Sequence, residues 1–390
     1  MYPRIVLNKN EERRINLGHQ WIFSNEISIA DDGIANGDIV EIYTHQNKFI
    51  GRGFYNKNSL IAFRLLTRNK KEIDREFILA RIKNADNFRK RIFRNRDSYR
   101  MVFSESDFLP GLIIDKFTDK YSIQIHSLGM EKYKNIIKDI LIDEYNASFI
   151  IEKNDNRLRE YEGLERKEGI LYGENEIFEI EIDGIKYNID LCEGQKTGFY
   201  FDQVNNRKIL SEYCTTDNKV LDLFCNEGGF ALSAAKAGMD IITAVDSSSR
   251  CIEIAKKNFE NNNFKEINFL CMDVFDLLKN NITNEIKFDI IILDPSSFTK
   301  SKKNIHTAES GYEELNHKAM QIINRNGILF TFTCSYHISA ESFKKIIMKS
   351  AQKAKRNIQI IKKLTASEDH PVLPAMQETE YLKGYVLRII

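Results

Sequence analysis

The segment Leu221-Asp-Leu-Phe-Cys-Asn-Glu-Gly-Gly-Phe230 decides the fold, because an apolar strand pattern passes directly into a Gly-Gly loop and a helix rich in Ala and Ser. Two later segments repeat the strand-then-loop pattern, namely Leu293-Asp-Pro-Ser-Ser-Phe298 and Phe332-Thr-Cys-Ser335. Ligands of open α/β sheets bind at the carboxyl ends of the strands, where loops from different strands converge. The three loops are therefore expected along one sheet edge, which indicates an enzyme.

Strand and helix patterns alternate around this segment. The expected strands are 219–223, 241–245, 267–270, 288–293 and 327–333, and a final run at 381–389 could pair antiparallel with 357–361. A hairpin is expected from 178–182 and 187–191, which flank Asp183-Gly184. This alternation predicts a doubly wound α/β sheet with helices on both faces, and we assign it residues 177–390.

The chain before residue 177 reads as two smaller domains. Short strand patterns at 39–43, 49–54 and 60–66 predict a small β-barrel over residues 1–70, with Trp21 interpreted as its core anchor. A strand-strand-helix-strand pattern predicts an α+β domain over 71–176, and its charged, Gly-punctuated end at 155–175 reads as a connection.

Cations crowd between residues 64 and 100, and much of this stretch has helical periodicity. The apolar positions that recur at three and four residues are Ile78, Ile82, Ala85, Phe88 and Ile92. The basic face has two open interpretations, a solvated surface or a phosphate-binding surface. The candidates for substrate contact are Arg89, Lys90 and Arg91.

Bulk properties narrow the class of protein. A length of 390 residues predicts two or three domains, and a net charge of +1 argues neither for nor against a nucleic-acid partner. The six cysteines form no Cys-x-x-Cys pair, which is typical of reduced thiols in a cytoplasm. No apolar run approaches the roughly 20 residues of a membrane span. We expect a cytoplasmic protein that binds no metal.

The loop after the first strand and the acidic ends of the next two strands suggest a nucleoside carrier. Gly228 and Gly229 let a backbone approach a ligand closely, although the spacing is not that of a dinucleotide site. Asp246 could accept the hydroxyls of a ribose or could cap the following helix, and Asp273 could meet an adenine amino group.

The remaining two loops suggest chemistry on a base. Asp294 stands in a loop preformed by Pro295, where it could bond the edge of an extruded base, with Phe298 available for stacking. Cys334 alone would read as a small core residue, but beside this loop it could add to an electrophilic ring carbon.

Taken with these loops, further motifs resemble the family of S-adenosylmethionine-dependent ribosomal RNA large-subunit methyltransferase I. The motifs that extend the match over nearly the whole chain are Gly18-His-Gln-Trp-Ile-Phe-Ser24, Gly51-Arg-Gly-Phe-Tyr55, Ser104-Glu-Ser-Asp-Phe-Leu-Pro-Gly111, Glu193-Gly-Gln-Lys-Thr-Gly-Phe-Tyr-Phe-Asp-Gln203, Asn206-Arg207, Asp369-His-Pro-Val-Leu373 and Tyr381-Leu-Lys-Gly384. The resemblance implies a PUA-like barrel, a central α+β domain and a Rossmann-like class I methyltransferase domain.

The resemblance also implies an activity, the formation of 5-methylcytosine in 23S ribosomal RNA, with S-adenosyl-L-methionine as cofactor. Cys334 would add to carbon 6, Asp294 would orient the base, and carbon 5 would take the sulfonium methyl group before Cys334 is expelled. The implied partner is large-subunit ribosomal RNA, without a membrane, and a homodimer stays open. The implied cofactor contacts are Gln195, Thr197, Phe199, Asp222, Phe224, Asn226, Gly228, Asp246, Ser247, Asp273, Val274 and Asp294.

Two departures and two rival functions remain. The chain has Ser296 where the family commonly has a second proline, and no cysteine in that loop could accept the carbon 5 proton, for which water is an alternative. A methyltransferase acting on guanine or an amine would not need Cys334, and a non-catalytic RNA-binding assembly factor would need no cofactor. Cys225 is a rival thiol, which we interpret as packed beneath the cofactor.

Overall fold

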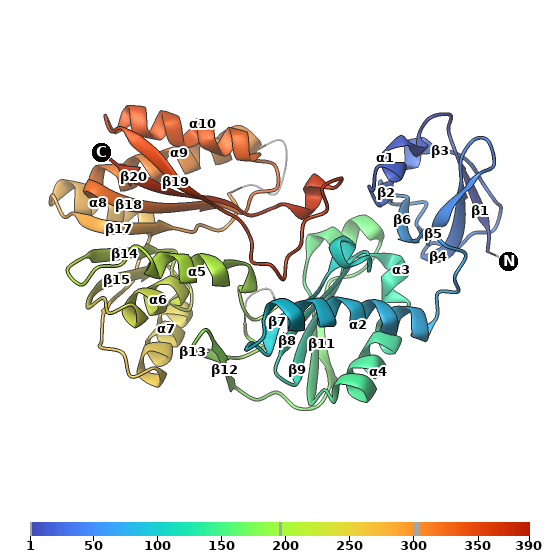
Figure 1. Ribbon diagram of the computed structural model, residues 1–390, viewed down its shortest axis with the longest axis horizontal. Coiled ribbons are helices and arrows are strands. Elements are labelled where there is room, and N and C mark those ends of the chain that lie inside the picture. Colours follow the sequence, from blue (N-terminus) through green and yellow to red (C-terminus); the bar gives the residue numbers. More distant parts are fainter. Residues whose placement is uncertain (1, 195–196, 299–303) are drawn as a thin grey trace. The chain divides into compact units, whose positions relative to one another are not determined.

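The computed structural model describes residues 2–194, 197–298 and 304–390, which fold into two compact units (Figure 1). Unit 1 takes the chain up to Ile180 together with Ile189–Phe201 and Glu368–Thr379. Unit 2 takes Glu181–Asn188, Asp202–Ser367 and Glu380–Ile390. Each of the three predicted domain ranges contains a sheet of its own, while the boundaries of these ranges stay a prediction.

The first sheet of unit 1 has the strand order β2-β6-β5-β4-β1-β3 and contains the three strands expected of a small barrel. Its strands are β1 Arg4–Leu7, β2 Trp21–Ile22, β3 Ile27–Ala30, β4 Asp38–Tyr43, β5 Phe49–Tyr55 and β6 Phe63–Thr67, with the helix α1 at Glu12–Asn16. Ile5, Val40, Ile42 and Phe63 are fully buried within it, so the apolar residues of these short strands form one core.

The second sheet of unit 1 has the order β11-β10-β9-β8-β7. Its elements are β7 Ser98–Phe103, β8 Leu112–Phe117, β9 Lys120–Ile125, β10 Phe149–Asn154 and β11 Lys167–Tyr172, with the helices α2 Arg75–Ile92, α3 Leu128–Glu131 and α4 Lys134–Tyr145 and the 3-10 helices η2 Ser104–Asp107 and η3 Arg157–Glu162. The reading of 155–175 as a connection is wrong, because η3 and β11 occupy it and β11 pairs antiparallel with β10.

Helix α2 begins at Asp74, whose carboxylate accepts a hydrogen bond from the Phe77 backbone N–H at 2.9 Å. Ile78, Ile82 and Ala85 are buried against the sheet, as the periodicity predicts. The prediction is wrong for Phe88, which was counted among the apolar positions of this helix. Phe88 is 43% exposed and does not belong to the buried face.

Trp21 anchors the first sheet differently from the prediction. It is only half-buried, and its indole N–H donates to Glu105 of η2 at 2.8 Å. The Arg64 guanidinium pairs with the same carboxylate at 3.0 Å and lies 5.2 Å from the indole ring centroid. Trp21 therefore ties the barrel to the second sheet instead of filling the barrel core.

The hairpin predicted around Asp183-Gly184 is present as β12 Phe178–Ile182 and β13 Ile185–Ile189. Both turn residues have positive φ, 52° and 71°, which is the backbone of a tight two-residue hairpin loop. The second strand therefore starts directly after the turn, two residues earlier than predicted.

The sheet of unit 2 has the order β16-β15-β14-β17-β18-β20-β19, with β14 to β18 parallel. The strands are β14 Lys219–Leu223, β15 Ile241–Asp246, β16 Asn268–Cys271, β17 Phe288–Leu293, β18 Ile323–Thr333, β19 Ile358–Leu364 and β20 Lys383–Ile389, and the helices are α5 Val204–Ser211, α6 Gly229–Lys236, α7 Ser249–Asn261, α8 Val274–Thr283, α9 Ile305–Ile322 and α10 Ala340–Lys353. In Figure 1, α5, α6 and α7 lie on one side of this sheet and α9 and α10 on the other, which confirms the doubly wound fold.

The last strand pairs antiparallel with 358–364, as predicted, and it also inserts beside β18. Gly384 permits this, because a Cβ there would collide with the Phe332 ring of β18. The insertion carries Lys383 next to Thr333, the residue before Cys334. Within the part of the chain described here, no helix is long and apolar enough to cross a membrane.

Candidate functional site

The loop after β14 has an unusual backbone. Phe224, Asn226 and Gly228 have positive φ angles of 63°, 48° and 84°, a left-handed conformation that non-glycine residues rarely adopt. The Gly228 N–H closes the turn by donating to the Cys225 carbonyl at 2.9 Å, and α6 begins at the next residue. A strand end thus passes within a few residues into a helix N-terminus, which favours anionic groups.

Asp222 lies beneath this loop and is almost fully buried. Its Oδ2 accepts from the Ala231 N–H in the first turn of α6 at 2.9 Å. Its Oδ1 is buried without a hydrogen-bond partner among the described residues. Burial raises the pKa of this carboxyl to about 7, so the site holds a carboxyl group that gains or loses its proton near neutral pH.

Asp246 at the end of β15 ties two loops together. Its Oδ2 accepts from the Asn226 N–H at 3.0 Å and its Oδ1 from the Ser248 N–H at 2.9 Å. The helix α7 is capped by the Ser248 hydroxyl, which accepts from the Cys251 N–H at 3.3 Å, so Asp246 is not the cap. Each carboxylate oxygen keeps a further lone pair for a ligand hydroxyl.

Asp273 at the end of β16 is the N-cap of α8. Its Oδ1 accepts from the Phe275 and Asp276 N–H groups at 2.8 and 3.2 Å. The side chain is exposed, as is Ser247, whereas Val274 is buried. The contact of Asp273 with an adenine stays a prediction.

Cys334 lies beside the Asp294 loop, where the sequence places it. The thiol Sγ is 3.9 Å from the Pro295 carbonyl oxygen, and the next side chain, Ser335, has its hydroxyl 2.8 Å from that of Ser297. The two strand ends after β17 and β18 therefore meet at one point of the sheet edge. Cys334 is half-buried.

Two residues around Cys334 were missed from the sequence. Lys383 of β20 is buried, and its ammonium donates to the carbonyls of Ser335 and Ile338 at 3.1 and 2.8 Å. Tyr312 of α9 lies with its hydroxyl 3.0 Å from the Ser335 hydroxyl. Burial lowers the pKa of Lys383, while the negative charges of Glu380 and Cys334 raise it.

Phe298 was predicted to stack on an extruded base. Its ring packs against Tyr312 with the centroids 4.5 Å apart, and it is half-buried on the edge of the unit 2 core. One face of the ring therefore supports the loop, and its contact with a base stays a prediction.

Cys225 is a poor nucleophile in this fold. It is buried within the loop after β14, and burial raises the pKa of its thiol well above its usual value. Because the thiolate is the reactive form, Cys334 is the better placed of the two thiols.

The predicted contacts before α5 belong to unit 1, apart from Gln195, which lies outside the described residues. The Thr197 hydroxyl accepts from Arg100 at 3.4 Å, and Arg100 also makes a two-bond pair with the buried Asp115 at 2.8 and 2.9 Å. Phe199 packs on Phe201 with centroids 5.0 Å apart. The contact of Gln195, Thr197 and Phe199 with a cofactor stays a prediction.

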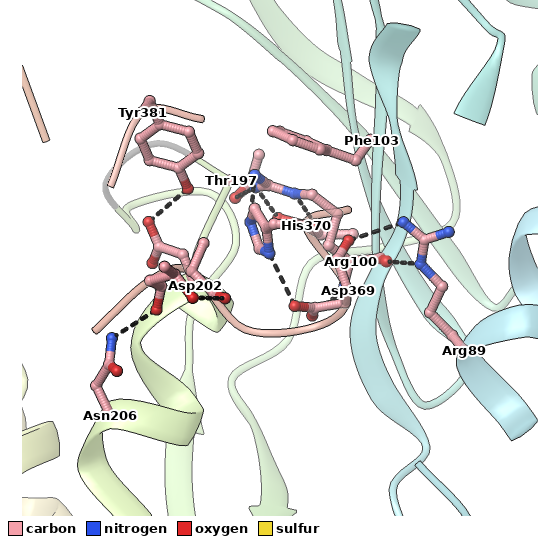
Figure 2. A network of polar contacts seen from close by, with 12 residues as sticks. Arg89, Arg100, Phe103, Thr197, Asp202, Asn206, Asp369, His370 and Tyr381 are labelled. Atoms are coloured by element: carbon pink, nitrogen blue, oxygen red, sulfur yellow. Dashed lines mark hydrogen bonds and ion pairs between the residues drawn. The ribbon is translucent and has the colours of Figure 1, made fainter. Parts of the chain in front are cut away.

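Figure 2 shows how the Asp369-His370 segment joins this network in unit 1. Asp369 accepts from the Arg100 backbone N–H at 2.9 Å and from the His370 ring at 2.8 Å, while the other ring nitrogen of His370 lies 2.9 Å from the Arg100 guanidinium. Arg100 is thus held on several sides, which fixes the group that contacts Thr197.

Two polar contacts of unit 2 are also drawn in Figure 2. The Tyr381 hydroxyl donates to Asp202 at 2.6 Å, and the Asn206 amide donates to the Thr365 carbonyl at 3.0 Å. Tyr381, Asp202 and Asn206 come from the motifs that carry the family resemblance, and the two contacts join segments of unit 2 that are distant in sequence.

The prediction for Arg89 is wrong. Arg89 was expected on the basic surface, but it is fully buried, and its guanidinium donates hydrogen bonds of 2.6 and 2.8 Å to the Asp107 carboxylate. It also donates to the Arg100 and Asp369 carbonyls at 3.0 and 2.8 Å. The charge of Arg89 is therefore paired inside unit 1, whereas Lys90 and Arg91 are exposed.

Known proteins match the chain over its whole length. A PUA-like domain family matches residues 5–68, and a methyltransferase domain family matches residues 215–381. A protein of Aliivibrio fischeri named Ribosomal RNA large subunit methyltransferase I is 36% identical over 398 residues, and one of the same name from Shewanella frigidimarina is 38% identical over 397 residues. Each alignment covers 100% of both chains.

Solved structures share the fold. A crystal structure of a protein complexed with SAH is 23% identical, covers 99% of both chains and has a TM-score of 0.86. A structure from Streptococcus mutans, also at 23% identity and 99% coverage, has a TM-score of 0.84.

Proposed function

The chain belongs to the ribosomal RNA large subunit methyltransferase I family, and from this premise we propose that it makes 5-methylcytosine in large-subunit ribosomal RNA through a Cys334 adduct. The observation that carries the proposal is the position of the Cys334 sulfur, 3.9 Å from the Pro295 carbonyl in the loop that presents Asp294. A nucleophile and a base-orienting carboxylate thereby share one end of the sheet.

The residues of the β14 loop fit S-adenosyl-L-methionine. Asp222 and Asn226 each have a buried side-chain oxygen without a partner in the described part of the chain, which is costly unless a ligand donates to it. Asp246 keeps lone pairs for ribose hydroxyls. The residues proposed to hold the cofactor are Asp222, Phe224, Asn226, Gly228, Asp246, Ser247, Asp273, Val274 and Asp294.

Bound there, the cofactor would supply an electrophilic methyl group on a sulfonium sulfur. The chain's own residues would prepare the cytosine to accept it. The Cys334 sulfur forms a bond to carbon 6, and the electron pair of the ring double bond moves to carbon 5, which becomes nucleophilic. Asp294 orients the base by accepting from its exocyclic amino group.

After carbon 5 is methylated, the adduct must break down. Carbon 5 loses its proton, the electron pair restores the ring double bond, and the carbon–sulfur bond breaks to return Cys334 as a thiolate. We propose water as the proton acceptor, since the Asp294 loop contains no second thiol. The Lys383 ammonium favours the thiolate at both ends of this cycle, because opposite charges stabilise each other.

The test is transfer of labelled methyl from S-adenosylmethionine to undermethylated large-subunit ribosomal RNA, followed by digestion and identification of the labelled nucleoside. Cys334→Ala should abolish 5-methylcytosine formation, while Cys214→Ala, which removes a half-buried thiol after α5 that contacts the Leu210 carbonyl and none of the residues proposed to hold cofactor or base, should leave it intact. RNA carrying 5-fluorocytosine should trap wild-type protein as a denaturation-resistant adduct, because fluorine cannot leave as the proton does.

Other outcomes separate the rivals. Labelled nucleoside that persists in Cys334→Ala would replace the thiol mechanism with methylation of another base. RNA binding without any S-adenosylmethionine binding would point instead to a non-catalytic assembly factor.

A further inference from the structure

A cavity of about 420 Å³ opens in unit 1, between α2 and the segment around η2. It is lined by Asn84, Ala85, Asn87, Phe88, Arg91, Ser106, Asp107, Phe108 and Pro371. None of these residues takes part in the methyl-transfer chemistry proposed above. The α2 residues stand three, four and seven positions apart, so one helix face supplies amides, a phenyl ring and a guanidinium to the same space.

Two phenyl rings in the cavity are exposed without filling a core. Phe88 is 43% exposed and Phe108 is 41% exposed. Phe108 adopts a left-handed backbone, with φ of 59°, which is strained for a bulky residue. The Arg81 guanidinium lies 5.2 Å from the Phe108 ring centroid. An apolar ring held at the surface in a strained turn, beside a cation, is suited to stacking on a flat ligand.

One polar atom in the cavity lacks a partner. Ser106 is only 7% exposed, and its buried hydroxyl has no hydrogen-bond partner among the described residues. A buried hydroxyl without a partner destabilises the fold, and a ligand that forms a hydrogen bond with it recovers that loss. The exposed amides of Asn84 and Asn87 add donors and acceptors at the cavity wall.

The charge at the cavity favours an anionic ligand. Arg91 is exposed, whereas the one carboxylate in the lining, Asp107, is neutralised by its two-bond pair with Arg89. A flat group with hydrogen-bonding edges and an attached phosphate satisfies the rings, the hydroxyl, the amides and Arg91 together. An unstacked nucleotide has these features.

We propose that this cavity binds one unstacked nucleotide of the RNA substrate, a nucleotide other than the one that is methylated. The base stacks on Phe88 and Phe108, the base edge or ribose meets Ser106 and Asn84, and Arg91 contacts the phosphate. The inference rests on the proposed function only in taking RNA as the substrate, and it makes unit 1 a reader of single-stranded RNA.

The test measures equilibrium binding of a fluorescein-labelled, mixed-sequence single-stranded RNA and of a duplex of the same composition to the full-length protein, without methyl donor. Phe88→Ala should weaken single-strand binding by about tenfold, because stacking contributes roughly 1–3 kcal/mol per base, and should leave duplex binding unchanged. Phe88→Tyr, which keeps an aromatic face, should bind like the wild type. Ala has the best helix propensity, so α2 should form in the variant.

A matched control and a salt titration sharpen the assignment. Tyr172→Ala removes an aromatic that is equally exposed, at 42%, but lies on β11 outside the cavity, and should leave binding unchanged. Arg91→Ala should lower the slope of log affinity against log salt by about 0.7, the value for one phosphate of a single strand. Phe88→Ala should leave this slope at its wild-type value.

Single-strand affinity that is unchanged in Phe88→Ala would overturn the inference, and so would a loss confined to assembled large-subunit particles, which would indicate a protein partner. The binding assay needs no methyl donor. Its result could therefore be interpreted even if the protein failed to form 5-methylcytosine. Conversely, intact methyl transfer with unchanged RNA binding in Phe88→Ala would sink the cavity proposal and leave the proposed function standing.

Discussion

The Lys383 ammonium donates to the Ser335 carbonyl oxygen at 3.1 Å, and so places a buried cation at the residue that follows Cys334. The two residues are 48 positions apart in sequence. They meet because β20 inserts antiparallel beside β18. The interaction holds the backbone at the end of β18 and adds a positive potential there, and a positive potential favours the thiolate form of a nearby cysteine.

Replacing Lys383 with Met should raise the pKa of the Cys334 thiol, because the variant removes an opposite charge that stabilises the thiolate. The measurement is the pH dependence of iodoacetamide alkylation at Cys334, followed by mass spectrometry of the peptide that contains it. Lys383→Arg, which keeps the charge, is the control. An unchanged midpoint in a folded Lys383→Met protein would show that the ammonium serves only the two carbonyls.

Replacing Arg89 with Ala should lower the free energy of unfolding by about 3–5 kcal/mol, because the two-bond pair made by the fully buried Arg89 is lost and Asp107, whose side chain is only 9% exposed, would remain charged without its partner. Arg91→Ala, two positions along the same helix, should change stability by less than about 0.5 kcal/mol. Urea unfolding of both variants makes the comparison. Equal, small effects would mean that Arg89 is a surface cation after all.

The sequence allowed most of the unit 2 sheet to be predicted, because parallel strands buried on both faces read as short apolar runs between helical patterns. It misled at α2 because Phe88 is apolar and Arg89 is charged. At about 100° per residue, Arg89 falls on the same side as Ile78 and Ile82, while Phe88 lies about a quarter of a turn away. The prediction gave more weight to residue type than to the position of each residue around the helix. The Asp107 carboxylate that pairs with Arg89 comes from another element, η2, so it leaves no signal in the α2 sequence.

Some residues of the candidate site could be predicted from the sequence and others could not. The positions of Cys334, Asp294 and Asp246 follow from the rule that loops converge at the carboxyl edge of the sheet. Lys383 lies in the motif Tyr381-Leu-Lys-Gly384, but its contact with Ser335 could not be predicted, because that contact depends on the insertion of β20. Tyr312 could not be found, because its contact depends on the packing of α9, which leaves no local pattern.

Gly228→Ala and Gly238→Ala form a matched pair. Both glycines have left-handed backbones, with φ of 84° and 89°, so each substitution should cost about 1–2 kcal/mol of stability. Only at Gly228 does the new Cβ approach another atom, the Ala255 Cβ at 3.1 Å, while the space around Gly238 is open. Gly228→Ala should therefore also displace the loop and raise KM for S-adenosylmethionine. Equal KM values in the two variants would separate this loop from cofactor binding.

Asp222→Asn should change how stability depends on pH. Burial raises the pKa of Asp222 from 3.8 to about 7 in the folded protein, so the protonated carboxyl contributes stability that is complete below about pH 3.8 and is lost as pH rises through 7. The loss is on the order of 4 kcal/mol at most, from about 1.4 kcal/mol per pKa unit. Asn cannot lose a proton, and its side-chain oxygen can still accept from the Ala231 N–H. Relative to the wild type, the variant should therefore become more stable between pH 5 and pH 8 in urea titrations. A difference in unfolding free energy that stays constant over this range would show that Asp222 ionises as an ordinary carboxyl and that its unpaired oxygen is solvated.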